Sequence, residues 1–144
     1  MVGGQYPAVV VHSLGDARCA LAPGLPVTLL SGEAAALYGG CGWWLALVTA
    51  ARAEFPKVAV ADFLDCADAS GHALAAVRIG LRHLILALDA PGRTRVAAII
   101  AGRDGVLLAE RPPALDLADP ANRRRLHEWV RTPGSPDDSA TALR

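Results

Sequence analysis

Short apolar runs alternate with amphipathic segments along most of this chain. The clearest stretch is 58–89, in which an apolar run, a turn of small residues, an amphipathic segment and a second apolar run follow one another. This pattern predicts one unit of strand, helix and strand, and the same rhythm recurs on both sides of it. We therefore expect an α/β fold.

Five apolar runs are predicted to be strands, and they cover 8–12, 26–31, 58–64, 83–88 and 106–109. The unbroken hydrophobicity of the second run is typical of a parallel strand that is buried on both faces. Right-handed crossovers place a helix between successive strands, so helices are expected to cover the sheet. The preferred fold is a single-domain, three-layer, doubly wound arrangement with a mostly parallel five-stranded sheet. The alternative is about half of a (βα)8 barrel.

Glycines and capping residues predict the helix limits. Segment 34–55 has helical character, but the glycine-rich stretch 39–42 predicts a break, because each glycine costs roughly 1 kcal/mol inside a helix. An Asp-Pro pair at 119–120 predicts the start of a last helix. The composition of 132–144 favours a disordered tail, which leaves 1–131 as the α/β domain. Further helices are predicted over 17–22, 71–79 (capped by Asp68 or Ser70) and 91–101.

The charge balance argues against nucleic acid as a partner. Lys plus Arg and Asp plus Glu are 14 each, so no surplus of positive charge is available for a phosphate backbone. Three arginines at 123–125 precede Glu128 and predict a solvated helix face. Charged residues make up 19% and hydrophobic residues 53% of the chain, which favours a homo-oligomer that covers excess apolar surface.

The cysteines and the apolar segments bear on the compartment. Cys19, Cys41 and Cys66 form no CxxC pair, and the start of the chain lacks the pattern of a signal peptide, so we expect free thiols and a cytoplasmic protein. Segment 34–51 is uncharged and close to the length that spans a bilayer. We favour a helix of an α/β fold over membrane insertion for two reasons. The segment is rich in alanine and glycine, and the next strand needs a helix to cover it.

In a parallel α/β sheet, ligands bind at the carboxyl ends of the strands, where helix N-termini point toward one edge. Polar residues that directly follow the predicted strands are therefore the candidates for a small-molecule site, and we expect them to converge on one cleft. As ligand-binding candidates we select His12, Ser13, Ser31, Asp89 and Arg111, the last for an anionic group.

The richest polar cluster follows the third predicted strand, where we take Asp65, Cys66 and Asp68 as candidate catalytic residues. The carboxylates suit general acid/base chemistry if burial raises one pKa, and the thiol suits nucleophilic catalysis if a helix terminus or His12 lowers its pKa. The alternative is that the aspartates cap the next helix while Cys66 packs as a small hydrophobic residue.

No motif in the chain specifies a cofactor, a metal or a reaction. The glycine-rich stretch 39–42 matches neither GxGxxG nor GxxxxGK[ST], and no GxSxG is present. The four histidines form no HxxH or HxxxH pair, and a metal site is conceivable only for His12 with Asp65 or Cys66. We therefore expect neither a metal nor a cofactor.

Two functions remain open at this stage. The first is a metabolite-binding protein or enzyme with its site at the carboxyl ends of the strands. The second is a non-catalytic protein that acts through contacts with itself or a partner. Trp43 and Trp44 motivate the second, because rings about 100° apart on a helix cannot both enter the core, and one is expected at an interface.

Overall fold

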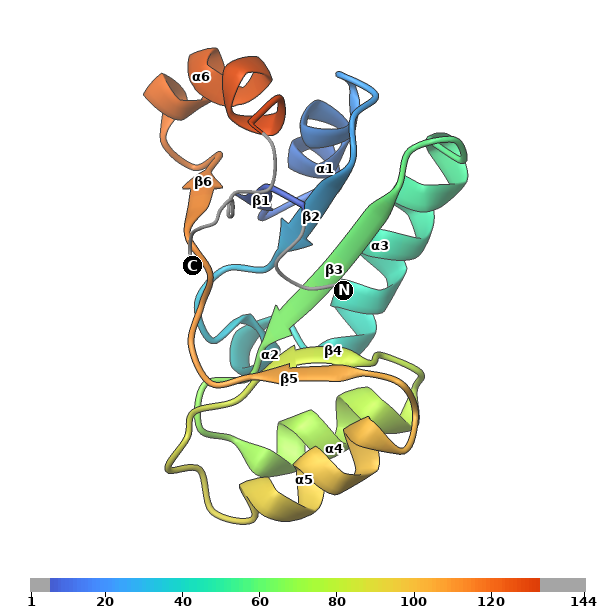
Figure 1. The fold of residues 1–144 in the computed structure, drawn as a ribbon, viewed down its shortest axis with the longest axis vertical. Helices are drawn as coiled ribbons and strands as arrows, with labels where there is room; N and C mark the ends of the chain where they lie inside the picture. Colours follow the sequence, from blue (N-terminus) through green and yellow to red (C-terminus); the bar gives the residue numbers. More distant parts are fainter. Residues whose placement is uncertain (1–5, 133–144) are drawn as a thin grey trace. The chain divides into compact units, whose positions relative to one another are not determined.

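The structure is a computed structural model that describes residues 6–132 (Figure 1). Within them the chain forms an α/β fold with an open sheet of parallel strands, which confirms the predicted class. Six strands are present where five were predicted. They are β1 (Ala8–Val10), β2 (Val27–Leu30), β3 (Val60–Asp65), β4 (His83–Ile85), β5 (Val106–Leu108) and β6 (Ala114–Asp116).

Six helices connect or follow these strands. They are α1 (Leu14–Leu21), α2 (Ala35–Tyr38), α3 (Cys41–Glu54), α4 (Ser70–Arg78), α5 (Arg93–Ala101) and α6 (Pro120–Val130). Strand β1 pairs with β2 and β6, strand β4 pairs with β3 and β5, and all four pairs are parallel.

The chain divides into two compact units. The first comprises the residues up to Leu30, Leu47–Asp62 and the residues from Pro112 onward, and the second comprises Ser31–Ala46 and Phe63–Arg111.

In the first unit, β1 is the middle strand between β2 and β6. Val10 is in register with Leu30 on one side and with Asp116 on the other. All three residues of β1 are buried, as expected for a parallel strand with neighbours on both edges. The carboxyl ends of β1 and β6 therefore lie side by side.

Helices α1 and α6 both begin close to these strand ends. Ser13 is the N-cap of α1, and its Oγ accepts a hydrogen bond from Asp16 N. Asp119 caps α6 by accepting from Ala121 N, and Pro120 takes the first helical position, as the sequence predicted. Trp129 Nε1 donates to Ala8 O at 2.8 Å and ties α6 to β1.

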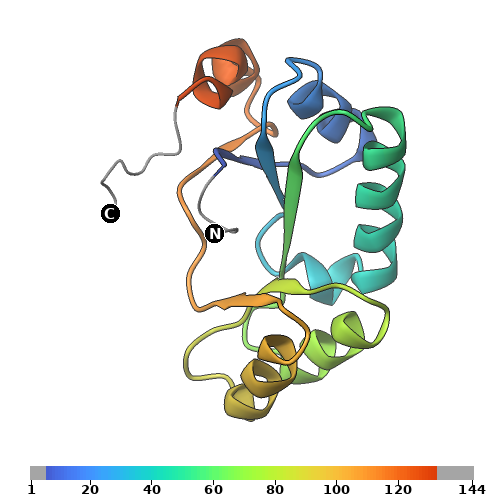
Figure 2. The same ribbon diagram turned by 45° about the vertical axis from the view of Figure 1, so that its right-hand side comes forward.

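The second unit contains β4, β5 and the carboxyl-terminal half of β3, and these strands are parallel. Helices α4 and α5 lie side by side against β4 and β5 in both ribbon views (Figures 1 and 2). The core between them includes Leu84, Val96 and Ile100. Gly105 permits the turn into β5, because a Cβ there would lie 2.2 Å from Arg82 O.

Several predicted boundaries were correct, and others were wrong. The break at 39–42 is confirmed, since α2 ends at Tyr38 and Gly40 has a φ of 86°. Neither Asp68 nor Ser70 caps α4, whose N-cap is Ala69 without a side-chain bond. Proline 91 lies outside α5, because Gly92 with a φ of 76° is the N-cap.

Strand β6 was not predicted from the sequence. The five residues 109–113 join β5 to β6, which is too short for the helical crossover of a standard unit. The predicted tail falls outside the described residues except for Thr132. In residues 6–132, no helix is both long enough and apolar enough to cross a membrane.

Candidate functional site

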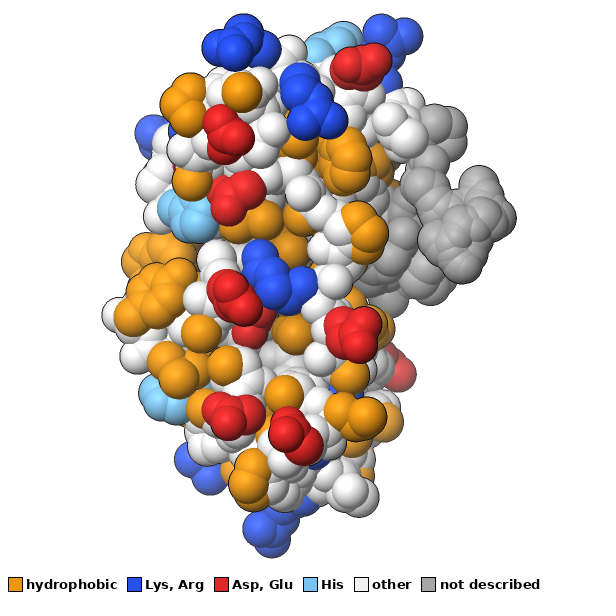
Figure 3. Space-filling model, turned by 90° about the vertical axis from the view of Figure 1, so that its left-hand side faces the viewer, with side chains coloured by type: hydrophobic (Ala, Val, Ile, Leu, Met, Phe, Trp, Pro, Cys, Tyr) orange, Lys and Arg blue, Asp and Glu red, His pale blue; other side chains and the backbone are white. Residues whose placement is uncertain are grey.

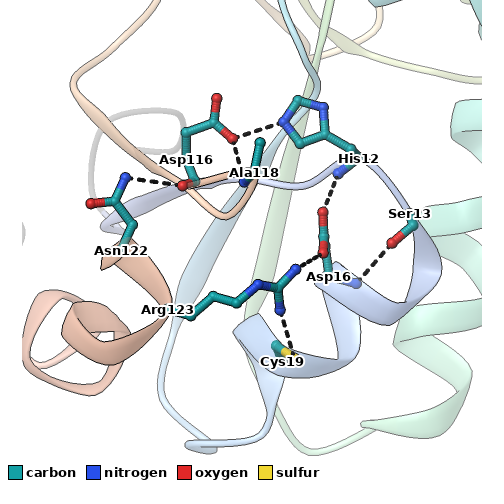
Figure 4. A network of polar contacts seen from close by, with 8 residues as sticks. All are labelled: His12, Ser13, Asp16, Cys19, Asp116, Ala118, Asn122 and Arg123. Atoms are coloured by element: carbon teal, nitrogen blue, oxygen red, sulfur yellow. Dashed lines mark hydrogen bonds and ion pairs between the residues drawn. The ribbon is translucent and has the colours of Figure 1, made fainter. Parts of the chain in front are cut away.

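His12 and Asp116 form a polar pair at the adjoining ends of β1 and β6. Nε2 of His12 lies 2.7 Å from Oδ1 of Asp116 (Figure 4). A carboxylate can only accept, so Nε2 of the neutral imidazole must carry the proton and Nδ1 must hold the lone pair. No other residue of 6–132 forms a hydrogen bond with Nδ1, and the His12 side chain is 38% exposed.

Asp116 is positioned by the chain that follows it. Its Oδ1 also accepts from Ala118 N at 2.9 Å, and Asn122 Nδ2 donates to Asp116 O at 3.0 Å. These bonds fold the segment between β6 and α6 into a turn around the carboxylate. Asp116 is thus held by Ala118 and Asn122 in addition to its contact with His12.

Asp16 links His12 to α6 from the opposite side. Its Oδ2 accepts from His12 N at 2.9 Å, and its Oδ1 pairs with Nη2 of Arg123. Asp16 is buried, while the Arg123 side chain is 44% exposed. The hydrogen bond to Asp16 raises the pKa of Arg123, and Nη1 of Arg123 lies 3.5 Å from Cys19 Sγ.

These residues form one network that joins β1, β6, α1 and α6 (Figure 4). Sequence analysis had named two of its members, His12 and Ser13. The predicted start of the first helix at residue 17 was wrong, because α1 starts at Leu14 with Ser13 as its cap. Asp116 was missed with its strand, and Arg123 had been assigned to a solvated face.

Ser31, Asp65 and Arg111 come together at strand ends of the second unit. Ser31 Oγ accepts from Asp65 N at 2.9 Å and donates to Gly32 O at 3.0 Å. One carboxylate oxygen of Asp65 accepts from Ala67 N at 2.8 Å, and the other lies 2.8 Å from Arg111 Nη1. The Asp65 side chain is 5% exposed, so its contacts are those of a buried structural ion pair.

The other candidates around β3 and β4 are separate from this pair. Burial raises the pKa of Cys66 to about 12, with a smaller contribution from the charge of Asp65. The thiol is therefore protonated near neutral pH, which favours the packing alternative over a nucleophile. Asp68 and Asp89 are exposed, and neither forms a hydrogen bond or ion pair with another residue of 6–132.

The two tryptophans divide between core and surface. Trp44 is fully buried, whereas Trp43 is 36% exposed, and their ring centroids lie 5.8 Å apart. Gly39 lies directly against the Trp43 ring, since a Cβ there would come within 2.9 Å of it. Trp43 is thus the tryptophan available for an interface.

Metal and polyanion sites have no further support in the described part of the chain. Residues 6–132 contain no group of three or more His, Cys, Asp or Glu side chains arranged to hold a metal ion. On the face shown in Figure 3, basic and acidic side chains are interspersed with hydrophobic ones.

No known family model matches the chain, and the search of curated proteins found no similar sequence. The functional interpretation therefore rests on the residues and their geometry.

Proposed function

We propose that this protein binds a small polar metabolite at the carboxyl ends of β1 and β6. The observation that supports this is the convergence of His12, Asp16, Asp116 and Arg123 on one network, although they lie on α1, β6, α6 and the loop after β1. A purely structural network needs no accessible groups. Here His12 and Arg123 both keep a substantial part of their side chains exposed.

The topology supports the same location. The chain passes from β1 to β2 on one side of β1, whereas β6 pairs with its other side. Such a reversal of strand order at carboxyl ends is the place where open α/β sheets bind ligands. Helices α1 and α6 begin at this point and direct their positive ends toward it.

A thermal-shift screen of phosphorylated, carboxylated and hydroxylated metabolites tests the proposal. A ligand at 100 times its Kd stabilises the folded state by about 2.7 kcal/mol, which is easily measured. The apparent affinity for the ligand should fall at least about tenfold in Arg123→Met. It should be unchanged in Arg124→Met, which replaces an exposed neighbour on the same helix. A screen without any stabilising metabolite, or equal binding by both variants, contradicts the proposal.

A second candidate function is self-association through the segment that joins α2 to α3. Leu37, Tyr38 and Trp43 are 46%, 70% and 36% exposed and lie within seven residues of one another. Large exposed apolar side chains in one segment are typical of contact surfaces. Light scattering across micromolar concentrations should show a dimer that Tyr38→Lys dissociates, and a monomer at every concentration contradicts this candidate.

A further inference from the structure

We infer that His12 and Asp116 form an acid–base pair, and that the ligand of this site is a substrate whose hydroxyl group, or an attacking water, transfers a proton to His12 Nδ1. This inference rests on the proposed binding site and adds a reaction class to it. Its basis is the geometry of the imidazole ring. One ring nitrogen is fixed by a carboxylate, the other has no hydrogen-bond partner in residues 6–132, and the side chain is 38% exposed.

His12 is held at its backbone and at one ring nitrogen. Its backbone N–H donates to Asp16 Oδ2 at 2.9 Å, and its Nε2 lies 2.7 Å from Asp116 Oδ1. Asp116 is in turn fixed by bonds from Ala118 N and Asn122 Nδ2. A histidine with these restraints has one tautomer and one orientation, which is what a general base requires before its substrate arrives.

The proton transfer is balanced without any further reactant. The substrate O–H bond breaks, its electron pair stays on oxygen, and a new N–H bond forms at Nδ1 of His12. The resulting imidazolium is stabilised by the Asp116 carboxylate. The same proton is returned to the product in the reverse direction.

Many surface histidines form hydrogen bonds without any catalytic role. The test must therefore distinguish a more reactive His12 from one that is only exposed to solvent. Diethyl pyrocarbonate does this without knowledge of the substrate. The lone pair of a neutral imidazole nitrogen attacks its carbonyl carbon, a C–N bond forms, and ethyl carbonate leaves and decays to carbon dioxide and ethanol. His72 and His127 are exposed and serve as controls within the same sample.

We expect mass spectrometry to show that His12 is modified at least about threefold faster than His72 and His127, although its own side chain is only 38% exposed. Asp116→Asn keeps an oxygen acceptor for Ala118 N and removes the negative charge, so it should lower the His12 rate to that of the controls. A smaller excess in the wild type, or an unchanged rate in Asp116→Asn, overturns the inference.

Two further measurements keep the test decisive. If Asp116→Asn does not fold, nitrogen-15 spectra of the wild-type imidazoles report the tautomer directly. A proton on His12 Nε2 supports the pair, and a proton on Nδ1 overturns it. The metabolite screen above tests binding separately, so a bound ligand together with an unreactive His12 leaves a binding protein without acid–base catalysis.

Discussion

Removal of the Arg111 side chain is the sharpest probe of the strand ends in the second unit. Arg111 Nη1 lies 2.8 Å from Oδ2 of Asp65. The Asp65 side chain is 5% exposed and that of Arg111 is 26% exposed. Arg111→Met preserves most of the apolar stem but leaves a buried carboxylate without its counter-charge.

The expected cost follows from these contacts. Breaking a buried ion pair by removing one partner destabilises proteins by about 3–5 kcal/mol. The other oxygen of Asp65 keeps its bond from Ala67 N, and water reaches one side of Arg111, so we expect a loss of about 2–3 kcal/mol. At roughly 3 °C per kcal/mol for a chain of this size, the melting temperature should fall by about 6–9 °C.

Chemical denaturation of four variants tests the reasoning. Arg111→Met is compared with Asp65→Asn, with the double variant and with Arg95→Met, which removes an exposed arginine of the same unit. The double variant should be more stable than Arg111→Met alone, because no unpaired charge remains. A loss below about 0.5 kcal/mol in Arg111→Met, equal to that of Arg95→Met, would refute the assignment of a buried ion pair.

The remaining predictions concern two thiols and two glycines. In the native protein, a thiol reagent at pH 8 should modify the exposed Cys19 and leave Cys66 unmodified until the chain unfolds. Because burial raises the pKa of Cys66 from 9.0 to about 12, its contribution to stability is present below pH 9 and is lost as the pH rises toward 12, which a denaturation series should show. Gly105→Ala should destabilise the protein by more than about 2 kcal/mol, since its Cβ would lie 2.2 Å from Arg82 O. Gly42→Ala in α3 meets open space and should stabilise the protein by about 0.5–1 kcal/mol. Equal melting temperatures of these two variants would contradict the packing described for them.

The elements that sequence predicted correctly are those whose signal is local. The apolar runs that became β1 to β5 are hydrophobic on both faces, and the Asp-Pro pair at 119–120 marks α6 by its own chemistry. Strand β6 has only three residues and follows two prolines, so its own sequence favours a loop. It is a strand because β1 offers a free edge, and that edge arises from residues about 100 positions earlier.

The same distinction explains which site residues were found. The rule that ligands bind at strand ends identified His12, because it directly follows a recognisable strand. Its partner Asp116 lies 104 positions away and comes into register only through the pairing of β1 with β6. Arg123 was assigned to a solvated face for the same reason, since nothing near it in sequence indicates the buried Asp16 that it contacts.

The two groups of strand-end residues differ in whether their polar atoms already have hydrogen-bond or ion-pair partners. Around Asp65, both carboxylate oxygens are engaged, the neighbouring thiol of Cys66 is protonated and buried, and the charge is neutralised by Arg111. Such a site stabilises the fold but offers no accessible proton acceptor. Around His12, the Asp116 carboxylate is engaged, whereas Nδ1 of the partly exposed imidazole has no hydrogen-bond partner in residues 6–132. Because catalysis requires a group that is fixed in position and still free to react, we propose the chemistry for the β1 and β6 ends and a structural role for the Asp65 cluster, which looked richest in sequence.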